Sequence, residues 1–262
     1  MYELVNATEM LKKAKAGHYA VGQFNINNLE WTKAILLTAQ ELNSPVILGV
    51  SEGAGKYMAG YKTVVGMVKG MMEEQKITVP VALHLDHGNS FEMAARALKA
   101  GYTSVMIDGS KEEFEANVTL SRRVAEMAHA MGIPVEGELG TVGGKEDNHE
   151  VKDSEKAYTD PEQAGEFAER TGVDSLAVGI GNAHGFYKGD PKLRFDILEE
   201  TRKRVSIPIV LHGASGIPDE DVKRATGLGI CKVNFATELR DAFSKGVKAY
   251  LKENPDTYDP KK

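Results

Sequence analysis

Eight short runs of β-type residues recur along the 262-residue chain, separated by longer segments of helical periodicity. The predicted strands are Tyr19–Phe24, Pro45–Val50, Val81–Leu85, Ser104–Ile107, Pro134–Leu139, Ser175–Ile180, Pro208–Leu211 and Cys231–Asn234. The helical segments between them include Leu29–Leu42, Phe114–Met131, Pro161–Thr171 and Asp219–Ala225. A strand followed by a helix, repeated eight times, predicts parallel strands joined by crossover helices.

The length favours one barrel over two domains, because (β/α)₈ barrels typically have about 250 residues. No Pro/Gly/Ser-rich linker divides residues 1–262. The alternative, an open doubly wound sheet, usually has a GxGxxG fingerprint after its first strand. Here the first predicted strand runs into Gln23–Asn28, which has no such glycines. We therefore predict an α/β fold with a single TIM barrel over the whole chain.

The composition excludes several classes of function. A net charge of −6 and a pI near 5.7 argue against nucleic acid or an anionic membrane as a partner. The single cysteine, Cys231, rules out an internal disulfide framework and fits a reducing compartment. No apolar run reaches the roughly 18 residues of a membrane span, and the N-terminus does not resemble a signal peptide. We expect a cytoplasmic protein.

Each predicted strand is apolar along its body and delivers polar residues at or shortly after its C-terminal end. In chain order these are Asn25, Ser51, Asp86, His87, Asp108, Glu138, His184, His212 and Asn234. Barrel enzymes assemble their sites from these strand ends and the following loops. For Ser51 or Asn25 alone, a helix N-cap explains the residue equally well.

Three histidines in this set predict a metal site. His87, His184 and His212 would supply three imidazoles and leave one position open, which is the ligand set of a catalytic zinc ion. Zinc held in this way acts as a Lewis acid or generates hydroxide. A fourth ligand would close the site, so we interpret His84 as a supporting or packing residue. Asp86 either orients a histidine ligand or acts as a general acid/base, and spacing does not decide between these roles.

Glycine-rich loops follow the last strands and predict a phosphorylated substrate. Residues Gly179–Gly189 and His212–Asp219 form two such loops, and the eighth strand leads into Asn234–Thr237. Loops in these positions form the recurrent phosphate site of TIM barrels, and Lys188 would add a charge. A third loop, Gly140–His149, is interpreted as a lid. Glu146 on this loop is either an acid/base or a solvated surface residue.

These motifs together resemble the class II, zinc-dependent ketose-bisphosphate aldolases over essentially the whole chain. The matching stretches are Leu83–His87, Gly137–Gly140 with Gly143-Gly144, Ala183–Gly185 with Tyr187-Lys188, and Leu211–Gly216. The resemblance implies reversible cleavage of fructose 1,6-bisphosphate to dihydroxyacetone phosphate and glyceraldehyde 3-phosphate, a step of glycolysis and gluconeogenesis.

The resemblance also implies roles for individual residues. His87, His184 and His212 correspond to the zinc ligands, and Asp108 and Glu138 to carboxylates that can meet the metal when it shifts. Zinc would polarise the C2 carbonyl and stabilise the enediolate, which Asn234 helps to hold. Asp86 would move the proton of the C4 hydroxyl. Glu146 would exchange the proton at C3.

The remaining implied contacts concern phosphate, a monovalent cation and a second subunit. The C1 phosphate would lie on Gly185, Lys188, Gly213, Ser215, Asn234 and Thr237. Asn25 and Ser51 would contact the other end of the substrate. Sodium or potassium would bind the carbonyls of Ala183, Gly185, Gly213 and Ser215. Family members are dimers or tetramers, which implies a homodimer or homotetramer in which Arg240 reaches a neighbouring C6 phosphate.

The chain departs from the family pattern in several places. Ala236 stands where some relatives have an acidic residue, and Val233–Leu239 looks like the tagatose-bisphosphate branch. The N-terminal half looks more like the fructose-bisphosphate branch of Gram-positive bacteria. Lys145 replaces a second glutamate found before Glu146 in some members. The chain ends at Lys262, where relatives continue into a further C-terminal helix, so we expect that helix to be absent.

Four alternatives stay open beside a fructose-bisphosphate aldolase. The first is a tagatose 1,6-bisphosphate aldolase of the same family. A Schiff-base aldolase would need a lysine at a strand end, and Lys232 and Lys188 are poorly placed for that role. A zinc hydrolase would release phosphate or acid products. A non-catalytic sugar-phosphate-binding protein would be expected to lose Asp86 or a metal ligand, and all of these are present.

Overall fold

The computed structural model describes residues 2–146, 149–151, 158–187, 189–259 and 261, and the side chains of residues 145–151 lie outside this description. Eight parallel strands close into a barrel in the order β1-β11-β10-β8-β5-β4-β3-β2. They are β1 (Val21–Asn25), β2 (Val46–Ser51), β3 (Val81–Gly88), β4 (Ser104–Ile107), β5 (Val135–Leu139), β8 (Ser175–Val178), β10 (Ile209–Leu211) and β11 (Ile230–Phe235). The predicted (β/α)₈ fold is confirmed.

The helices between successive strands cover the outside of the barrel, and one further helix lies toward each end of the chain. They are α1 (Thr8–Gly17), α2 (Leu29–Glu41), α3 (Glu52–Tyr57), α4 (Tyr61–Glu74), α5 (Phe91–Ala100), α6 (Phe114–His129), α7 (Pro161–Thr171), α8 (Phe195–Arg204), α9 (Asp219–Gly227) and α10 (Thr237–Glu253). Side chains cap several of their N-termini, as Asn28 does for α2, Ser90 for α5 and Asp160 for α7. These caps satisfy backbone N–H groups that have no partner within the helix.

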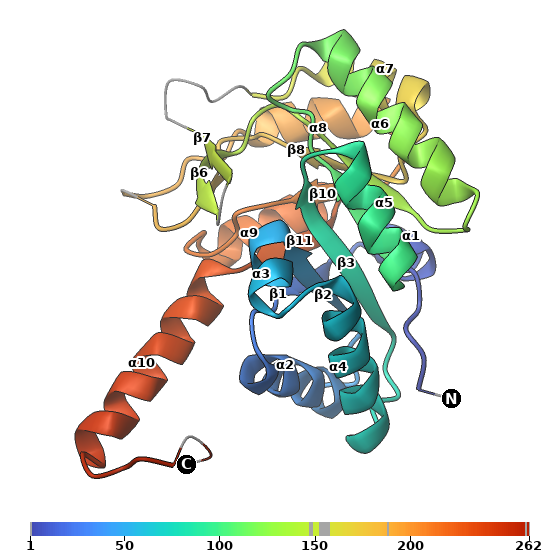
Figure 1. The fold of residues 1–262 in the computed structure, drawn as a ribbon. Helices are drawn as coiled ribbons and strands as arrows, with labels where there is room; N and C mark the ends of the chain where they lie inside the picture. The colour runs from blue at the N-terminus through green and yellow to red at the C-terminus, as the bar shows by residue number, and fades with distance from the viewer. Residues whose placement is uncertain (1, 147–148, 152–157, 188, 260, 262) are drawn as a thin grey trace.

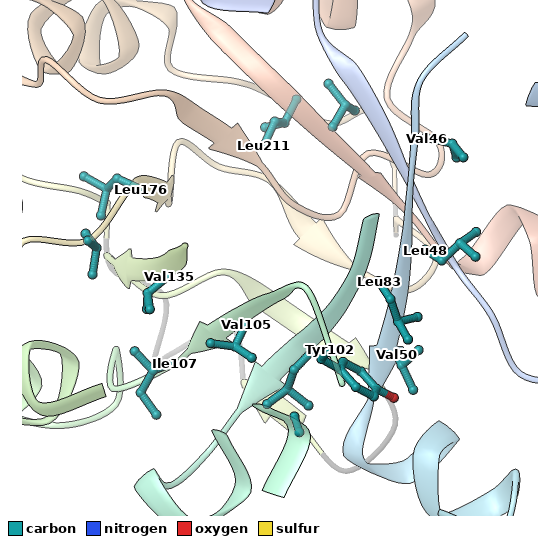
Figure 2. Close-up of a cluster of buried hydrophobic side chains, with 14 of the residues drawn as sticks. Val46, Leu48, Val50, Leu83, Tyr102, Val105, Ile107, Val135, Leu176 and Leu211 are labelled. Carbon is teal, nitrogen blue, oxygen red and sulfur yellow. The ribbon is translucent and has the colours of Figure 1, made fainter. Parts of the chain in front are cut away.

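Strand alternation separates an apolar outer layer from a partly polar barrel interior. On β2, Val46, Leu48 and Val50 face the helices and join the main core (Figure 2). Inside the barrel, Met106, Ala177 and Val210 form a small apolar cluster. Buried polar side chains share the interior, among them Gln23, His84, Glu136 and Lys232, each at most 1% exposed. The helix α1 packs against the barrel through Met10, Leu11 and Ala14, which cluster with Val21, Ile47 and Ala82.

Two features lie outside the regular barrel. A small sheet of order β7-β6-β9 is formed by β6 (Gly143–Glu146), β7 (His149–Val151) and β9 (Ala183–His184). The helix α10 projects away from the barrel and has no buried residue (Figure 1). Within the described part of the chain, no helix combines the length and apolar character needed to cross a membrane.

Candidate metal and substrate site

The structure brings His87, His184 and His212 together at the C-terminal end of the barrel. His87 lies near the end of β3, His184 in β9 after β8, and His212 directly after β10. All three side chains are buried, and one ring nitrogen from each lies within 4.8 Å of the others. The Nε2 atom of His87 is 3.0 Å from Nδ1 of His212. The three strand ends therefore form one compact imidazole cluster.

Carboxylates fix the orientation of two of these rings. The Nδ1 atom of His87 is 2.9 Å from Oδ2 of Asp108, and Nε2 of His212 is 2.8 Å from Oε1 of Glu136. A neutral imidazole that donates its N–H to a carboxylate presents the lone pair of its other nitrogen. With a metal bound, the rings would present Nε2 of His87 and Nδ1 of His212, the two nitrogens that face each other here.

The cluster fits a zinc ion. Two nitrogens bound at 2.0–2.1 Å in a tetrahedral arrangement lie about 3.3 Å apart, close to the observed separation. The surroundings are also anionic. Burial lowers the pKa of His87, but the hydrogen bond to Asp108 and the charges of Asp86 and Glu138 outweigh it and raise that pKa well above its usual value. A buried site with two carboxylates beside its imidazoles suits a divalent cation.

His87 has an unusual backbone conformation that explains how it reaches the site beside Asp86. Sequence alternation predicted that the strand would end at Leu85, but β3 continues to Gly88. The φ angle of His87 is 50°, and the pairing of β3 with β4 shifts register between Leu85 and Gly88. This irregularity interrupts the alternation of side chains between faces. Left-handed backbone at a non-glycine residue is costly and is concentrated at functional sites.

Asp86 is a buried carboxylate that accepts a hydrogen bond from Asn25. Its side chain is 1% exposed, and Asn25 donates a hydrogen bond from Nδ2 to Oδ2 of Asp86 at 2.7 Å. Burial raises the pKa of Asp86, but His87 and His212 outweigh this effect and hold the pKa below its usual value. The Oδ1 atom has no hydrogen-bond partner among the described residues. An ionised carboxylate with one open oxygen can accept a proton from a bound molecule.

Asp108 and Glu138 form a second possible ligand group with His87. The Oε2 atom of Glu138 is 3.9 Å from Nδ1 of His87, on the same side as Asp108. Burial and the neighbouring charge of Asp108 raise the pKa of Glu138 well above its usual value. Two carboxylates beside one imidazole can hold a metal displaced from the histidine cluster.

A cavity beside the histidines gathers most of the predicted phosphate-binding residues. It is lined by Asn25, His184, Gly185, Gly213, Ser215, Asn234, Ala236 and Thr237. The side chain of Asn234 is 7% exposed, and neither its Nδ2 nor its Oδ1 has a partner among the described residues. Buried amides are normally hydrogen-bonded, so Asn234 is prepared for a ligand. The predicted contact of Lys188 lies outside the described residues.

The first turn of α10 borders this cavity. The helix begins at Thr237, and Ala236 before it offers no capping side chain. Ser215 partly takes that role, because its Oγ accepts a hydrogen bond from the backbone N–H of Glu238 at 3.3 Å. The N-terminus of a helix attracts anions through its N–H groups and its dipole. This arrangement suits a phosphate.

The predicted lid is part of the small sheet. Gly144 pairs with His184, so the segment after β5 is attached to a proposed metal ligand. Gly144 has a φ of +91°, and an added Cβ would lie 2.0 Å from the backbone oxygen of His184. Only glycine allows this close approach. Glu146 ends β6, and its side chain lies outside the described part of the structure.

Several other predicted residues have defined places. Ser51 caps α3, because its Oγ accepts a hydrogen bond from the N–H of Ala54. Ala183 donates its backbone N–H to the hydroxyl of Tyr187, which donates to the carbonyl of Gly213 at 2.9 Å. One of the four carbonyls expected around a monovalent cation thus already accepts a hydrogen bond. Arg240 lies in α10.

Lys232, the alternative Schiff-base lysine, is buried inside the barrel. It is 1% exposed, and its Nζ is 2.7 Å from Oε2 of Glu136. A Schiff base would require this buried amine to leave its ion pair and reach a substrate carbonyl at the strand ends. The arrangement does not favour a Schiff-base mechanism.

Sequence reasoning assigned no supporting role to three buried polar residues: Gln23, Glu136, and Lys232, which it weighed only as a Schiff-base lysine. Each lies two positions before a predicted site residue, namely Asn25, Glu138 and Asn234. Residues two apart on a strand face the same side, so alternation alone places them in the barrel beneath the site. The two-residue spacing from the predicted site residues could therefore have identified these three residues as facing the barrel interior.

Comparison with known proteins agrees with this geometry. The family described as class-II fructose-bisphosphate aldolase matches residues 5–262. A fructose-bisphosphate aldolase of Geobacillus stearothermophilus is 56% identical over 259 residues, which cover 99% of this chain and 90% of that protein. One from Staphylococcus epidermidis is 52% identical with the same coverage.

Solved structures support the same relationship. The YdjI aldolase from Escherichia coli K12 aligns with a TM-score of 0.82 and 39% identity, covering 98% of this chain and 88% of that chain. The fructose-bisphosphate aldolase from Campylobacter jejuni aligns with a TM-score of 0.77 and 30% identity, covering 96% and 82%. The chain therefore belongs to the class II fructose-bisphosphate aldolase family.

Proposed function

We propose that this protein is a zinc-dependent aldolase that reversibly cleaves fructose 1,6-bisphosphate to dihydroxyacetone phosphate and glyceraldehyde 3-phosphate. The observation that carries the proposal is that three kinds of side chain lie together in one buried site. These are the facing imidazoles of His87 and His212, the carboxylate of Asp86, and the amide of Asn234, which has no partner among the described residues. The names of the relatives supply the choice of sugar.

His87, His184 and His212 would hold the zinc ion, with Asp108 and Glu138 as supporting or alternate ligands. When bound, zinc supplies a Lewis acid that polarises the substrate carbonyl and stabilises negative charge on its oxygen. The buried carboxylates around His87 and His212 keep both rings oriented for this task.

The protein's own groups would carry the proton transfers. Asp86 accepts the proton of the C4 hydroxyl while the C3–C4 bond breaks, and C4 becomes the aldehyde carbon of glyceraldehyde 3-phosphate. The bonding electron pair stays on C3 of the other fragment. Protonation at C3, for which we propose Glu146, then completes dihydroxyacetone phosphate. The depressed pKa of Asp86 keeps it ionised and able to accept the first proton.

The substrate phosphate next to the carbonyl end would lie in the cavity at the start of α10. Gly185, Gly213, Ser215, Asn234 and Thr237 line this cavity, and we propose Lys188 as an additional cation. Ser51 and Asn25 would face the other end of the sugar. We also propose a sodium or potassium ion on the carbonyls of Ala183, Gly185, Gly213 and Ser215, next to the phosphate.

We further propose a homodimer or homotetramer in the cytoplasm. The projecting helix α10 buries none of its residues, and Val247, Tyr250 and Leu251 are each more than a third exposed. Clustered apolar side chains on a projecting helix favour association. Arg240 on the same helix would then reach the C6 phosphate of a neighbouring site. Sedimentation equilibrium tests this proposal, and a monomer at micromolar concentration would contradict it.

The decisive assay compares two sugars on zinc-replete protein. We expect kcat/KM for fructose 1,6-bisphosphate to exceed that for tagatose 1,6-bisphosphate, with two triose phosphates formed from each molecule cleaved. A clear preference for tagatose bisphosphate would overturn the choice of sugar. Release of inorganic phosphate would instead indicate a hydrolase, and binding without turnover a sugar-phosphate-binding protein.

A further inference from the structure

A chain of two hydrogen bonds lies behind Asp86 in the barrel interior. Gln23 on β1 is completely buried, and its Nε2 donates to Oδ1 of Asn25 at 3.0 Å. Asn25 in turn donates from Nδ2 to Oδ2 of Asp86 at 2.7 Å. Gln23 lies two residues before Asn25 on the same strand, so it is farther from the C-terminal end of the barrel. Among the described residues, the hydrogen bonds connect it to Asp86 through the amide of Asn25.

The direction of these bonds matters, because an asparagine amide has two nearly isosteric orientations. With the NH₂ group toward Asp86, the amide donates to the carboxylate. With the oxygen toward Asp86, two acceptors would face each other, and Asp86 would lose its donor. The Nε2 of Gln23 favours the first orientation, because it donates to the Oδ1 atom of Asn25, while Oε1 of Gln23 has no partner among the described residues.

Gly49 on the neighbouring strand provides the space for this arrangement. Asn25 pairs with Gly49 in the parallel ladder between β1 and β2. A Cβ at this position would lie 2.3 Å from Oδ1 of Asn25 and 2.5 Å from Nε2 of Gln23, the two atoms of the first hydrogen bond. Any larger residue would displace one of the two amides.

We infer that Gln23 and Gly49 are positioning residues for the aldol step, which hold the Asn25 amide with its donor toward Asp86. The inference rests on the proposed function, since it assigns Asp86 the transfer of the C4 proton. Gln23 would influence turnover without contacting substrate or metal. Its effect should therefore fall on kcat, while KM and zinc content stay near normal.

The test is a double-mutant cycle with Gln23→Met, which keeps the side-chain length and removes both polar groups, and Asn25→Ala. We expect Gln23→Met alone to lower kcat about five- to tenfold, the effect of one buried hydrogen bond. In the Asn25→Ala background the same substitution should change kcat less than twofold, because the residue through which it acts is absent. Gln40→Met is the matched control. It removes the hydrogen bond from Thr78 N–H to Oε1 of Gln40 far from the barrel mouth and should leave kcat unchanged.

Two results would overturn the inference. One is an unchanged kcat for Gln23→Met. The other is an equal loss in both backgrounds, which would show that Gln23 acts independently of Asn25. A crystal structure of the Gln23→Met variant separates this inference from the proposed function, since it needs no turnover. Loss of the Asn25–Asp86 hydrogen bond supports positioning by Gln23, and a retained 2.7 Å contact contradicts it.

Discussion

At the scale of single residues, buried carboxylates decide which nitrogen each ring presents. Asp108 holds Nδ1 of His87 and Glu136 holds Nε2 of His212, so opposite nitrogens of the two rings face each other. The sequence predicted which histidines would meet, because strand ends converge in a barrel. It could not predict the tautomers, since these depend on carboxylates contributed by other strands.

The role of Asp86 is tested by Asp86→Asn, which keeps the shape and removes the base. We expect kcat to fall by about 10² to 10⁴. Zinc content should stay near one per chain, because the structure places Asp86 beside the histidines and not among the grouped ligand atoms. Steady-state kinetics and metal analysis of the same preparation measure both. Loss of zinc would indicate that Asp86 mainly supports a ligand.

Glu136→Gln tests whether the hydrogen bond between Glu136 and His212 helps His212 to bind zinc. The substitution weakens the hydrogen bond to His212 and leaves the buried ammonium of Lys232 without its counter-charge. We expect zinc affinity, measured by competition with a chelating dye, to fall about 10- to 100-fold. Glu115→Gln is the control, since this exposed residue pairs with Arg170 on the surface. Equal zinc affinity in the two variants would contradict the supporting role.

At the scale of elements, the eight barrel strands were predictable and the small sheet was not. Runs such as Ser104–Ile107 begin and end where predicted, because buried parallel strands read as short apolar segments. The strands β6 and β9 are short, and β6 begins with two glycines. Their pairing joins Gly143 to Ala183, and no local pattern encodes a contact over that separation. The sequence therefore predicted only a lid loop there.

Glycine has a necessary role where the loops approach each other. Gly213 has a φ of +61°, and a Cβ there would lie 2.3 Å from the backbone oxygen of Ala183. We expect Gly213→Ala to destabilise the protein by about 1–3 kcal/mol or more. In Gly70→Ala, on α4, the added Cβ meets no atom of the described residues within 4 Å, and the substitution should stabilise the protein by about 0.5–1 kcal/mol. Denaturant unfolding of both variants checks the opposite signs, and equal stabilities would refute the argument.

At the scale of the whole molecule, buried polar side chains pair with one another across the barrel interior. Lys232 and Glu136 pair across 96 residues of sequence, and His84 hydrogen-bonds Ser104 through Nδ1. Alternation predicts that such residues point inward, but their partners follow from barrel closure and strand order. The closed barrel was predictable from the repeated β/α pattern, and this internal network was not.

The buried imidazole of His84 makes stability depend on pH. Burial and the charge of Lys232 lower its pKa to about 3, against 6.5 in an unfolded chain. Below pH 6.5 the unfolded chain therefore binds a proton that the folded protein does not, and stability falls as pH falls. The contribution approaches about 1.4 kcal/mol per pH unit. His84→Asn should flatten the loss between pH 6.5 and 4.5 in metal-free protein, as measured by chemical denaturation. Parallel curves for the two proteins would contradict this assignment.

The central claim is that three histidines hold a zinc ion that the cleavage of the sugar bisphosphate requires. The direct measurement is triose phosphate formation before chelation, after complete removal of metal, and after addition of one equivalent of zinc. We predict that chelation abolishes cleavage and that zinc restores it in the wild type, whereas His184→Ala is not restored. Full activity in verified metal-free protein, together with inactivation by borohydride in the presence of substrate, would contradict the account.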